Sequence, residues 1–245
     1  MKNRSCAMLV ISLVVWMGAP THAQTEGGQF DLLVRGIKAA SVSYSADRDG
    51  TVYCVTGRVQ TTGLAAVIKR LRYDGAAAGA VVKGRLRPAS YRESANTGRR
   101  QSEATLAYEG GVPEVTAYSP AGDAVPGQVD PGDVDPTTMG GSVDPLTAFY
   151  ATMGSVDAGR ECNLSLTLFD GKRASQLQIG APVAAGDIVT CDGSYIRVKG
   201  FTAKEMAKQT RFSFSLTYSP TTAGRMQVVE VTSESIYGKV TLKRR

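Results

Sequence analysis

Hydrophobic and polar residues alternate along much of this chain, as in half-buried antiparallel β-strands. The clearest run is residues 211–218, RFSFSLTY, which puts four apolar side chains on one face: Phe212, Phe214, Leu216 and Tyr218. Residues 236–243 alternate in the same way. Further runs lie at 30–46, 51–60, 64–73, 79–87, 101–109, 113–118, 162–169, 174–179, 186–191, 194–199 and 225–232. Short strands separated by frequent turn signals predict a mainly β protein, either a sandwich or a barrel.

Two segments predict short helices. Asp144 as N-cap and Pro145 at the first helical position begin one helix, which ends near Gly154. Thr202, with Glu205 three residues later, forms a capping box for a second helix that ends at Lys208. We expect these helices to be lids or plugs over barrel ends and not a separate helical domain.

A segment rich in Gly, Pro and Asp follows the run at 113–118. Residues 119–143, SPAGDAVPGQVDPGDVDPTTMGGSV, predict a flexible acidic loop. Its acids at 130, 133 and 135 lack the spacing and the distal Glu of an EF-hand, so no metal site is expected there. The chain shows no internal repeat, and residues 24–245 are expected to form one barrel-like domain.

The N-terminus has the features of a secretory signal peptide. Lys2 and Arg4 precede an apolar run at residues 6–18, and Thr21-His22-Ala23 forms a small-residue cleavage site. The run is too short to span a bilayer as a mature helix, and no later apolar run is long enough to do so. We therefore expect residues 1–23 to be removed and the protein to be exported, with no transmembrane span afterwards.

Removal of the signal peptide excludes several chemistries. The only histidine, His22, leaves with it, which excludes His-based triads, His general bases and His-ligated metals. Neither Gly-x-Ser-x-Gly nor Ser-x-x-Lys occurs. The remaining net charge is about +4, too modest to indicate nucleic-acid binding. We predict a non-enzymatic protein without a cofactor, with a carboxylate- or Ser–Lys-based hydrolase as an alternative.

Two groups of residues are candidates for binding. A basic stripe on alternating strand positions is a candidate patch for an anionic partner, although the alternation favours a solvated outer face: Arg70, Arg72, Lys83, Arg85 and Arg87. The apolar faces of two runs are candidates for lining the interior of a barrel: Leu164, Leu166, Leu168, Phe212, Phe214 and Leu216.

Three cysteines remain after the signal peptide, so an oxidising compartment should pair two of them. Cys162 shares the apolar face of the run that it begins, and Cys191 shares the face of Val189. If their strands are adjacent, these two could form a disulfide. Cys54 falls on the polar face of its run and is predicted to be unpaired, with a Cys54–Cys191 bridge as the alternative.

The centre of residues 161–180, ECNLSLTLFDGKRASQLQIG, raises the question of an active site. Asp170-Gly171 between two alternating runs is instead a strong hairpin signal, because Gly accepts a positive φ. Lys172 and Arg173 are then expected to be solvated residues just after the turn.

Several blocks resemble one family: FDLLVRGIKAASVSYSA, RLRPASY, VDPLTAFY, CNLSLTLFDGKRASQLQI, CDGSYIRVKGF and SESIYGKVTLKRR. Over about residues 29–245 the chain is similar to the exported bacterial proteins called domain of unknown function 3108. The resemblance implies a periplasmic protein with a curved antiparallel sheet in an open or spiral β-barrel, and it brings no catalytic residues. The blocks that contain Cys162 and Cys191 match parts of the family pattern, which supports pairing them.

These observations favour a non-enzymatic protein of the Gram-negative periplasm and cell envelope. It would bind a lipid-like ligand inside a curved β-sheet plugged by the 144–154 helix, or bind another envelope protein as a scaffold with a solid core. A roomy cavity lined by the candidate interior residues would favour the lipid, and side chains packed to native density would favour the scaffold.

Overall fold

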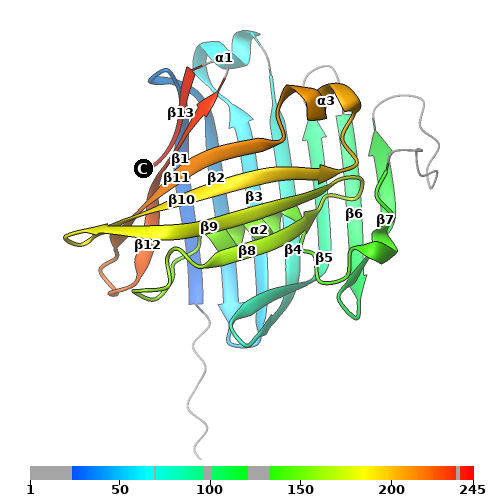
Figure 1. Cartoon of the computed structure of the whole chain (residues 1–245), viewed down its shortest axis with the longest axis horizontal. Helices are drawn as coiled ribbons and strands as arrows, with labels where there is room; N and C mark the ends of the chain where they lie inside the picture. Colours follow the sequence, from blue (N-terminus) through cyan, green and yellow to red (C-terminus); the bar gives the residue numbers. More distant parts are fainter. Residues whose placement is uncertain (1–23, 69, 97–100, 121–132, 236–237) are drawn as a thin grey trace, which may run out of the picture.

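The computed structural model describes residues 24–68, 70–96, 101–120, 133–235 and 238–245, so the predicted signal peptide lies outside it. In this part of the chain, thirteen antiparallel strands form one continuous sheet (Figure 1). The first seven are β1 Gln24–Val34, β2 Ile37–Asp49, β3 Val52–Thr61, β4 Arg72–Val82, β5 Arg85–Asn96, β6 Gln101–Glu109 and β7 Val112–Pro120. The other six are β8 Leu164–Phe169, β9 Ala174–Ala185, β10 Ile188–Lys199, β11 Arg211–Pro220, β12 Met226–Ser235 and β13 Gly238–Arg244.

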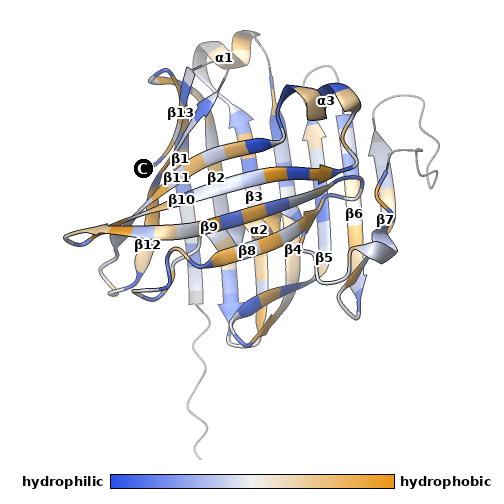
Figure 2. Cartoon of the chain, viewed as in Figure 1, coloured by the Kyte–Doolittle hydropathy of each residue, from blue (hydrophilic) through white to orange (hydrophobic). Residues whose placement is uncertain are grey.

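The strands form two meanders that join where the ends of the chain meet. β1 to β7 pair in sequence order, β8 to β13 do likewise, and β13 pairs with β1 so that Val34 lies opposite Val240. In Figure 1 the first meander runs vertically, and β8 to β11 cross in front of it. Hydrophobic and hydrophilic residues alternate along the strands (Figure 2). The predicted mainly β, curved and open barrel is confirmed.

The helix α2, Pro145–Met153, lies between the two meanders and not across a barrel end (Figure 1). Asp144 is its N-cap, Pro145 occupies the first turn and Gly154 follows its last residue, as the sequence predicts. Leu146 lies directly against Gly57 of β3, where a β-carbon would come within 2.7 Å of Leu146 Cδ1. A glycine in β3 therefore makes room for the helix.

Aromatic side chains fill the space around α2. Tyr150 packs against Tyr44 and Tyr53, with ring centroids 6.3 and 6.1 Å apart. Residues from both meanders are fully buried in the same cluster: Phe30, Leu106, Phe169, Leu216 and Val228. The inward faces of the two meanders and the helix thus share one core.

Several predicted boundaries are wrong. The predicted strand at 64–73 is the short helix α1, Gly63–Ile68, followed by the start of β4, because a short apolar run fits either element. The predicted strand at 79–87 contains a hairpin turn, in which Lys83 and Gly84 have φ of 52° and 76°. The runs at 186–191 and 194–199 are one strand, since the ring of Phe214 covers Gly193 in the middle of β10.

The second half of the predicted flexible loop is packed against the sheet. Residues 133–143 include the 3₁₀ turn η1, Pro136–Thr138, and bury three apolar side chains: Val134, Met139 and Val143. Gly141 N donates to Gly111 O beside β7, and Val143 N donates to Thr167 O of β8. This segment covers the gap between the two edge strands. The rest of the predicted loop, 121–132, lies outside the described residues.

The second predicted helix is α3, Ala203–Lys208, and its Thr202–Glu205 capping box is present. Within the described ranges, none of the helices has the length and apolar character needed to cross a membrane.

Candidate functional site

A hollow of about 740 Å³ lies on the outer face of β1 to β6. A second hollow of about 560 Å³ continues it and shares four residues with it: Arg58, Asp74, Ser94 and Glu103. Most of the lining side chains occupy outward positions of strands whose alternate residues are buried in the core. We call this continuous depression the trough.

The trough follows from the register of successive strands. One row of cross-strand neighbours is Ser43, Arg58, Asp74, Ser94 and Glu103. The next row is Ser45, Thr56, Ala76, Arg92 and Thr105. Small side chains in these rows, among them Ser43, Ser94 and Ala76, leave parts of the sheet uncovered beside the longer charged side chains.

Asp74 is held between two arginines of the trough. Arg58 Nε lies 2.6 Å from Asp74 Oδ1, and Arg72 pairs with the other carboxylate oxygen. The Arg72 guanidinium, together with Arg58, holds the pKa of Asp74 below its usual range. These ion pairs join β3 to β4 where the two hollows meet, and they leave a net charge of one cation there.

Arg92 and Glu103 border the same trough without such partners. Within the described ranges, neither side chain takes part in an ion pair. Arg92 and Glu103 lie on neighbouring strands, beside the hydroxyls of Ser45, Thr56 and Thr105. Together these groups can bind a polar ligand that carries both positive and negative groups. Among the described lining residues, none other than the buried Tyr44 has a large apolar side chain against which an acyl chain could pack.

The chain matches the family model described as "Protein of unknown function (DUF3108)" over residues 29–241. This match covers the trough, α2 and all three cysteines that follow the predicted signal peptide. The chain belongs to this family.

A solved structure, described as a β-barrel-like protein of domain of unknown function DUF1849 from Brucella abortus, is also similar. It shares 12% sequence identity with this DUF3108 protein, and the TM-score is 0.42. The likeness covers 89% of this chain and 94% of that one. No curated protein matches the chain.

The structure of this DUF3108 protein does not bring the five residues of the predicted basic patch together. Arg70 and Arg72 lie at the start of β4, whereas Lys83, Arg85 and Arg87 lie at the turn between β4 and β5 and just after it. The strand between them is 11 residues long, so the two groups lie at opposite ends of the hairpin, roughly 30 Å apart. One continuous patch is therefore a wrong prediction, because the chain folds back at Lys83.

The six candidate interior residues face inward but line neither hollow. Leu168 and Leu216 are buried, and the other four are half-buried. Leu164 and Phe214 pack against the main core, Leu166 packs against a smaller cluster that includes Ala148 of α2, and Phe212 lies beside Tyr195 and Arg197. These contacts and α2 occupy the inner face of the second meander.

A disulfide joins Cys162 and Cys191, whose Cα atoms are 5.4 Å apart, in agreement with the predicted pairing. The expected adjacency of their strands is wrong, since β9 lies between β8 and β10. Cys162 lies before the start of β8, in the segment that leads into this strand. That segment passes close enough to β10 for Cys162 to bond Cys191. Cys54 is free and exposed on the outer face, one row from Thr56 of the trough.

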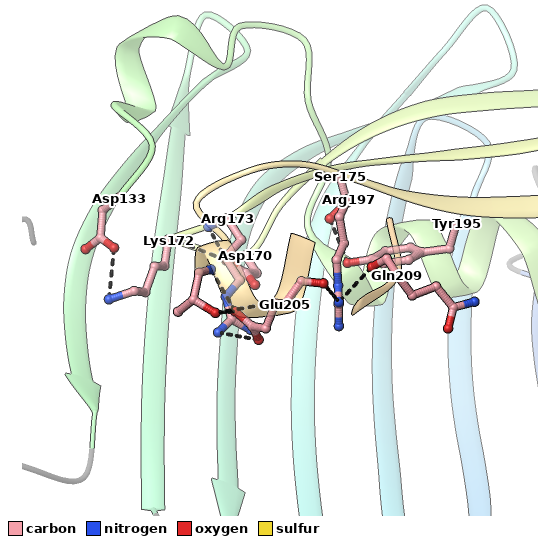
Figure 3. A network of polar contacts seen from close by, with 10 residues as sticks. Asp133, Asp170, Lys172, Arg173, Ser175, Tyr195, Arg197, Glu205 and Gln209 are labelled. Carbon is pink, nitrogen blue, oxygen red and sulfur yellow. Dashed lines mark hydrogen bonds and ion pairs between the residues drawn. The ribbon is translucent and has the colours of Figure 1, made fainter. Parts of the chain in front are cut away.

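The turn Asp170-Gly171-Lys172-Arg173 is a structural joint (Figure 3). Asp170 accepts hydrogen bonds from the backbone amides of Lys172 and Arg173 at 2.9 and 2.7 Å, and burial raises the pKa of this carboxyl. The predicted hairpin is present, with a four-residue connection between Phe169 and Ala174.

The expectation that Lys172 and Arg173 are solvated is wrong. Lys172 pairs with Asp133 at 2.9 Å, which ties the β8–β9 turn to the segment that covers the gap. Arg173 pairs with Glu205 of α3 at 3.5 Å and lies over the ring of Phe201, as does Arg197. Arg197 also donates to the backbone oxygens of Glu205 and Gln209 (Figure 3). Local sequence patterns carry no signal for this joint, because its members come from four separate segments.

Two further carboxylates lie on the inward side of the trough strands, and one of them, Glu93, is half-buried and also lines the larger hollow. Tyr91 donates to Glu93, and the Tyr91 and Tyr73 hydroxyls lie 2.9 Å apart. Burial raises the pKa of Glu93, and the nearby Asp170 carboxylate adds to the effect. No group of three or more His, Cys, Asp or Glu side chains within the described ranges is arranged to hold a metal ion.

The other carboxylate, Asp144, is fully buried at the start of α2. It accepts from Thr147 N at 2.7 Å and from Thr147 Oγ1 at 2.6 Å, and Thr147 Oγ1 lies 2.8 Å from the Tyr53 hydroxyl. Burial raises the pKa of Asp144 to about 6, although the bonds from Thr147 oppose the shift. The cap that holds the central helix is therefore sensitive to pH.

Replacing Asp144 by asparagine should stabilise the protein at neutral pH. The folded state holds a proton on Asp144 more tightly than the unfolded state does, so ionisation favours unfolding as the pH rises from 3.8 towards 6. Above that range the cost approaches about 3 kcal/mol. The asparagine side chain would keep an oxygen for Thr147 N, so D144N should exceed the wild type by about 1–3 kcal/mol at pH 7 and lose this advantage near pH 4.

Urea unfolding of both proteins across this pH range measures the difference. D135N is the matched control, because Asp135 caps η1 in the solvent and the hydroxyl and amide of Thr137 lower its pKa. The control should show the opposite sign, with stability lost above the ordinary carboxyl pKa. A D144N advantage that does not change with pH would show that ionisation of Asp144 is not its cause.

Proposed function

We propose that this protein is an exported, non-enzymatic scaffold of the bacterial cell envelope that binds a partner protein through the trough. The observation that carries the proposal is that both hollows lie outside the barrel, while α2 and aromatic side chains occupy the inside. The lipid-carrier alternative needs the reverse arrangement, with an open apolar interior.

The trough suits a polypeptide segment better than a lipid acyl chain or a sugar. Its hydroxyl groups can exchange hydrogen bonds with a peptide backbone, and Arg92 and Glu103 can pair with side chains of either sign. Among the described lining residues the one aromatic, Tyr44, is directed into the core, so sugar rings would have no stacking surface. A partner with charged, extended residues fits this chemistry.

The buried carboxylates favour a structural role over a hydrolytic one. Asp170 holds a turn, Asp144 caps α2 and Glu93 accepts from a buried tyrosine. A glycosidase-type pair needs two carboxylates that are free to act on a substrate in one cleft. Asp74 and Glu103 both border the trough, but Asp74 is held by Arg58 and Arg72, which does not suit it to act on a substrate.

Export to the periplasm follows from the predicted signal peptide and is supported by the disulfide, which persists in oxidising compartments. β1 begins at Gln24, the residue after the predicted cleavage position. A periplasm in which reductants are scarce would keep the Cys162–Cys191 bridge intact.

Site-directed cross-linking from Cys54 tests the proposal. A thiol-reactive photo-cross-linker on Cys54, one row from the trough, should capture a discrete protein in a periplasmic extract. Ala76→Arg puts a long side chain on the floor of the trough and should lower the yield about tenfold or more, which corresponds to about 1.4 kcal/mol of binding.

Ala185→Arg is the matched control, since Ala185 is exposed near the β9–β10 turn and far from the trough strands in the sheet order. Its cross-linking yield should equal that of the wild type. Native mass spectrometry of the same preparation should show no stoichiometric lipid. An adduct that persists in Ala76→Arg, or one lipid retained per protein, would contradict the proposed function.

A further inference from the structure

The tip of the β4–β5 hairpin combines exposed apolar and basic side chains. Val82 precedes the turn and is 48% exposed, and Val52 of β3 is 50% exposed. Both lie on the outer face, where Val52 is opposite Ala80 and Val82 is opposite Arg85. Because they are diagonal neighbours on adjacent strands, the two valines form one small apolar surface.

Basic side chains border this surface. Lys83 is in the turn, Arg85 lies opposite Val82, and Arg87 lies opposite Ala80. All three are exposed, and no salt bridge involves them within the described ranges. Asp49, opposite Val52, is the acidic neighbour in the same row. Three cations against one anion leave the tip positively charged.

The hairpin is firmly held below its tip. Val81 and Leu86 face inward and pack against the main core, and the Lys83-Gly84 turn has the left-handed geometry that suits a two-residue hairpin. The valines and the cations are therefore presented together on a fixed element. A surface of this kind can insert apolar groups at a bilayer interface while its cations contact anionic headgroups.

The chain also enters the domain at this edge. Figure 1 places the β4–β5 turn and the start of β1 at the lower edge, with α1 and α3 at the opposite edge. During export, before the predicted signal peptide is cleaved, the apolar run at residues 6–18 would hold this edge next to the membrane.

We infer that the β4–β5 tip is a membrane-docking surface that binds the headgroup region of an anionic lipid bilayer through Lys83, Arg85 and Arg87, with Val52 and Val82 inserted at the interface. The docking is peripheral and reversible. It is independent of the trough, so the protein can hold a partner there while its lower edge rests on a membrane.

Co-sedimentation with lipid vesicles tests this inference. Protein isolated from the periplasm, with its N-terminus defined by mass spectrometry, should sediment with phosphatidylglycerol vesicles and not with phosphatidylcholine vesicles. Added salt should weaken the binding. R85E/R87E should lower the partition coefficient at least about tenfold, and V52S/V82S should lower it by about threefold or more.

The matched control is R70E/K204E, which changes the net charge equally at the opposite edge. Both control residues are exposed, and this variant should retain binding within about twofold of the wild type. Far-ultraviolet circular dichroism should show the same β-sheet signal in every variant. Absence of sedimentation with phosphatidylglycerol, equal binding to both lipids, or an equal loss in the control would overturn the inference. Retention by a protein partner but not by vesicles would overturn it as well.

Discussion

Leu146→Ala should lower the free energy of unfolding by about 2–5 kcal/mol, because it empties space at the centre of the barrel. Leu146 is 4% exposed and is the residue of α2 that lies against Gly57. Removing its branched end leaves a cavity between α2 and β3 in the shared core. Urea unfolding followed by circular dichroism measures the loss.

Gly57 provides a sharper version of the same experiment. A β-carbon there would lie 2.7 Å from Leu146 Cδ1, so Gly57→Ala alone should destabilise the protein by about 1–3 kcal/mol. In the Leu146→Ala background the added methyl group enters the vacated space, and the same substitution should be neutral or stabilising. The sign of the Gly57→Ala effect should therefore change between the two backgrounds.

The double-mutant cycle also has a control. Gly180→Ala adds a methyl group to a strand glycine of the second meander that has no atom within 4 Å of its β-position. Its effect should be the same with leucine or alanine at 146. Additive effects of Gly57→Ala and Leu146→Ala would show that this contact does not place the helix.

The inward faces were predictable because strand periodicity is local. Phe214, Leu216 and Leu164 face inward as their alternation requires. The Asp144 cap and the Thr202–Glu205 box were also predictable, since each depends on residues within three positions of one another. Local patterns therefore define the elements and the side of each element that is buried.

The trough was not predictable, because it depends on the register of many strands. Ser43, Arg58, Asp74, Ser94 and Glu103 form one row only after five strands have paired. The predicted basic patch was wrong for a related reason. Its residues alternate correctly, but the turn at Lys83 sends the chain back along the sheet and separates Arg72 from Arg85.

The same limit applies to the helix inside the barrel. The capping residues predicted where α2 begins and ends, but its position depends on a contact between Leu146 and a glycine 89 positions earlier in the chain. Likewise, the packed segment 133–143 had the composition of a loop, and the structure gives its backbone amides partners beside the sheet edges on Gly111, Thr167 and Lys172. Composition does not show whether the backbone groups of a segment find hydrogen-bond partners. Here the edges of the sheet provide such partners, and the bonds hold residues 133–143 in place.

Removal of the disulfide should cost about 3–4 kcal/mol in unfolding free energy, since the bridge joins residues 29 positions apart. C162A/C191A tests this in urea. Cys191 is fully buried, so its truncation adds a small cavity cost, and reduction of the wild type with dithiothreitol separates the two contributions. Cys54→Ala is the matched control and should change the stability by less than about 0.5 kcal/mol, because Cys54 is exposed and unpaired.

Because of where the disulfide lies, its removal should loosen one part of the sheet in addition to lowering the stability of the whole protein. β8 is an edge strand that pairs with β9 alone, and the chain leading into it is tied to β10 by Cys162–Cys191. Without the bridge, β8 is still tied to the covering segment by the hydrogen bonds that Val143 makes with Thr167 and Phe169. Amide hydrogen exchange should therefore accelerate first in residues 164–169 and 174–179, while β2 to β5 remain protected. Equal acceleration across both meanders would show instead that the bridge stabilises the sheet as one cooperative unit.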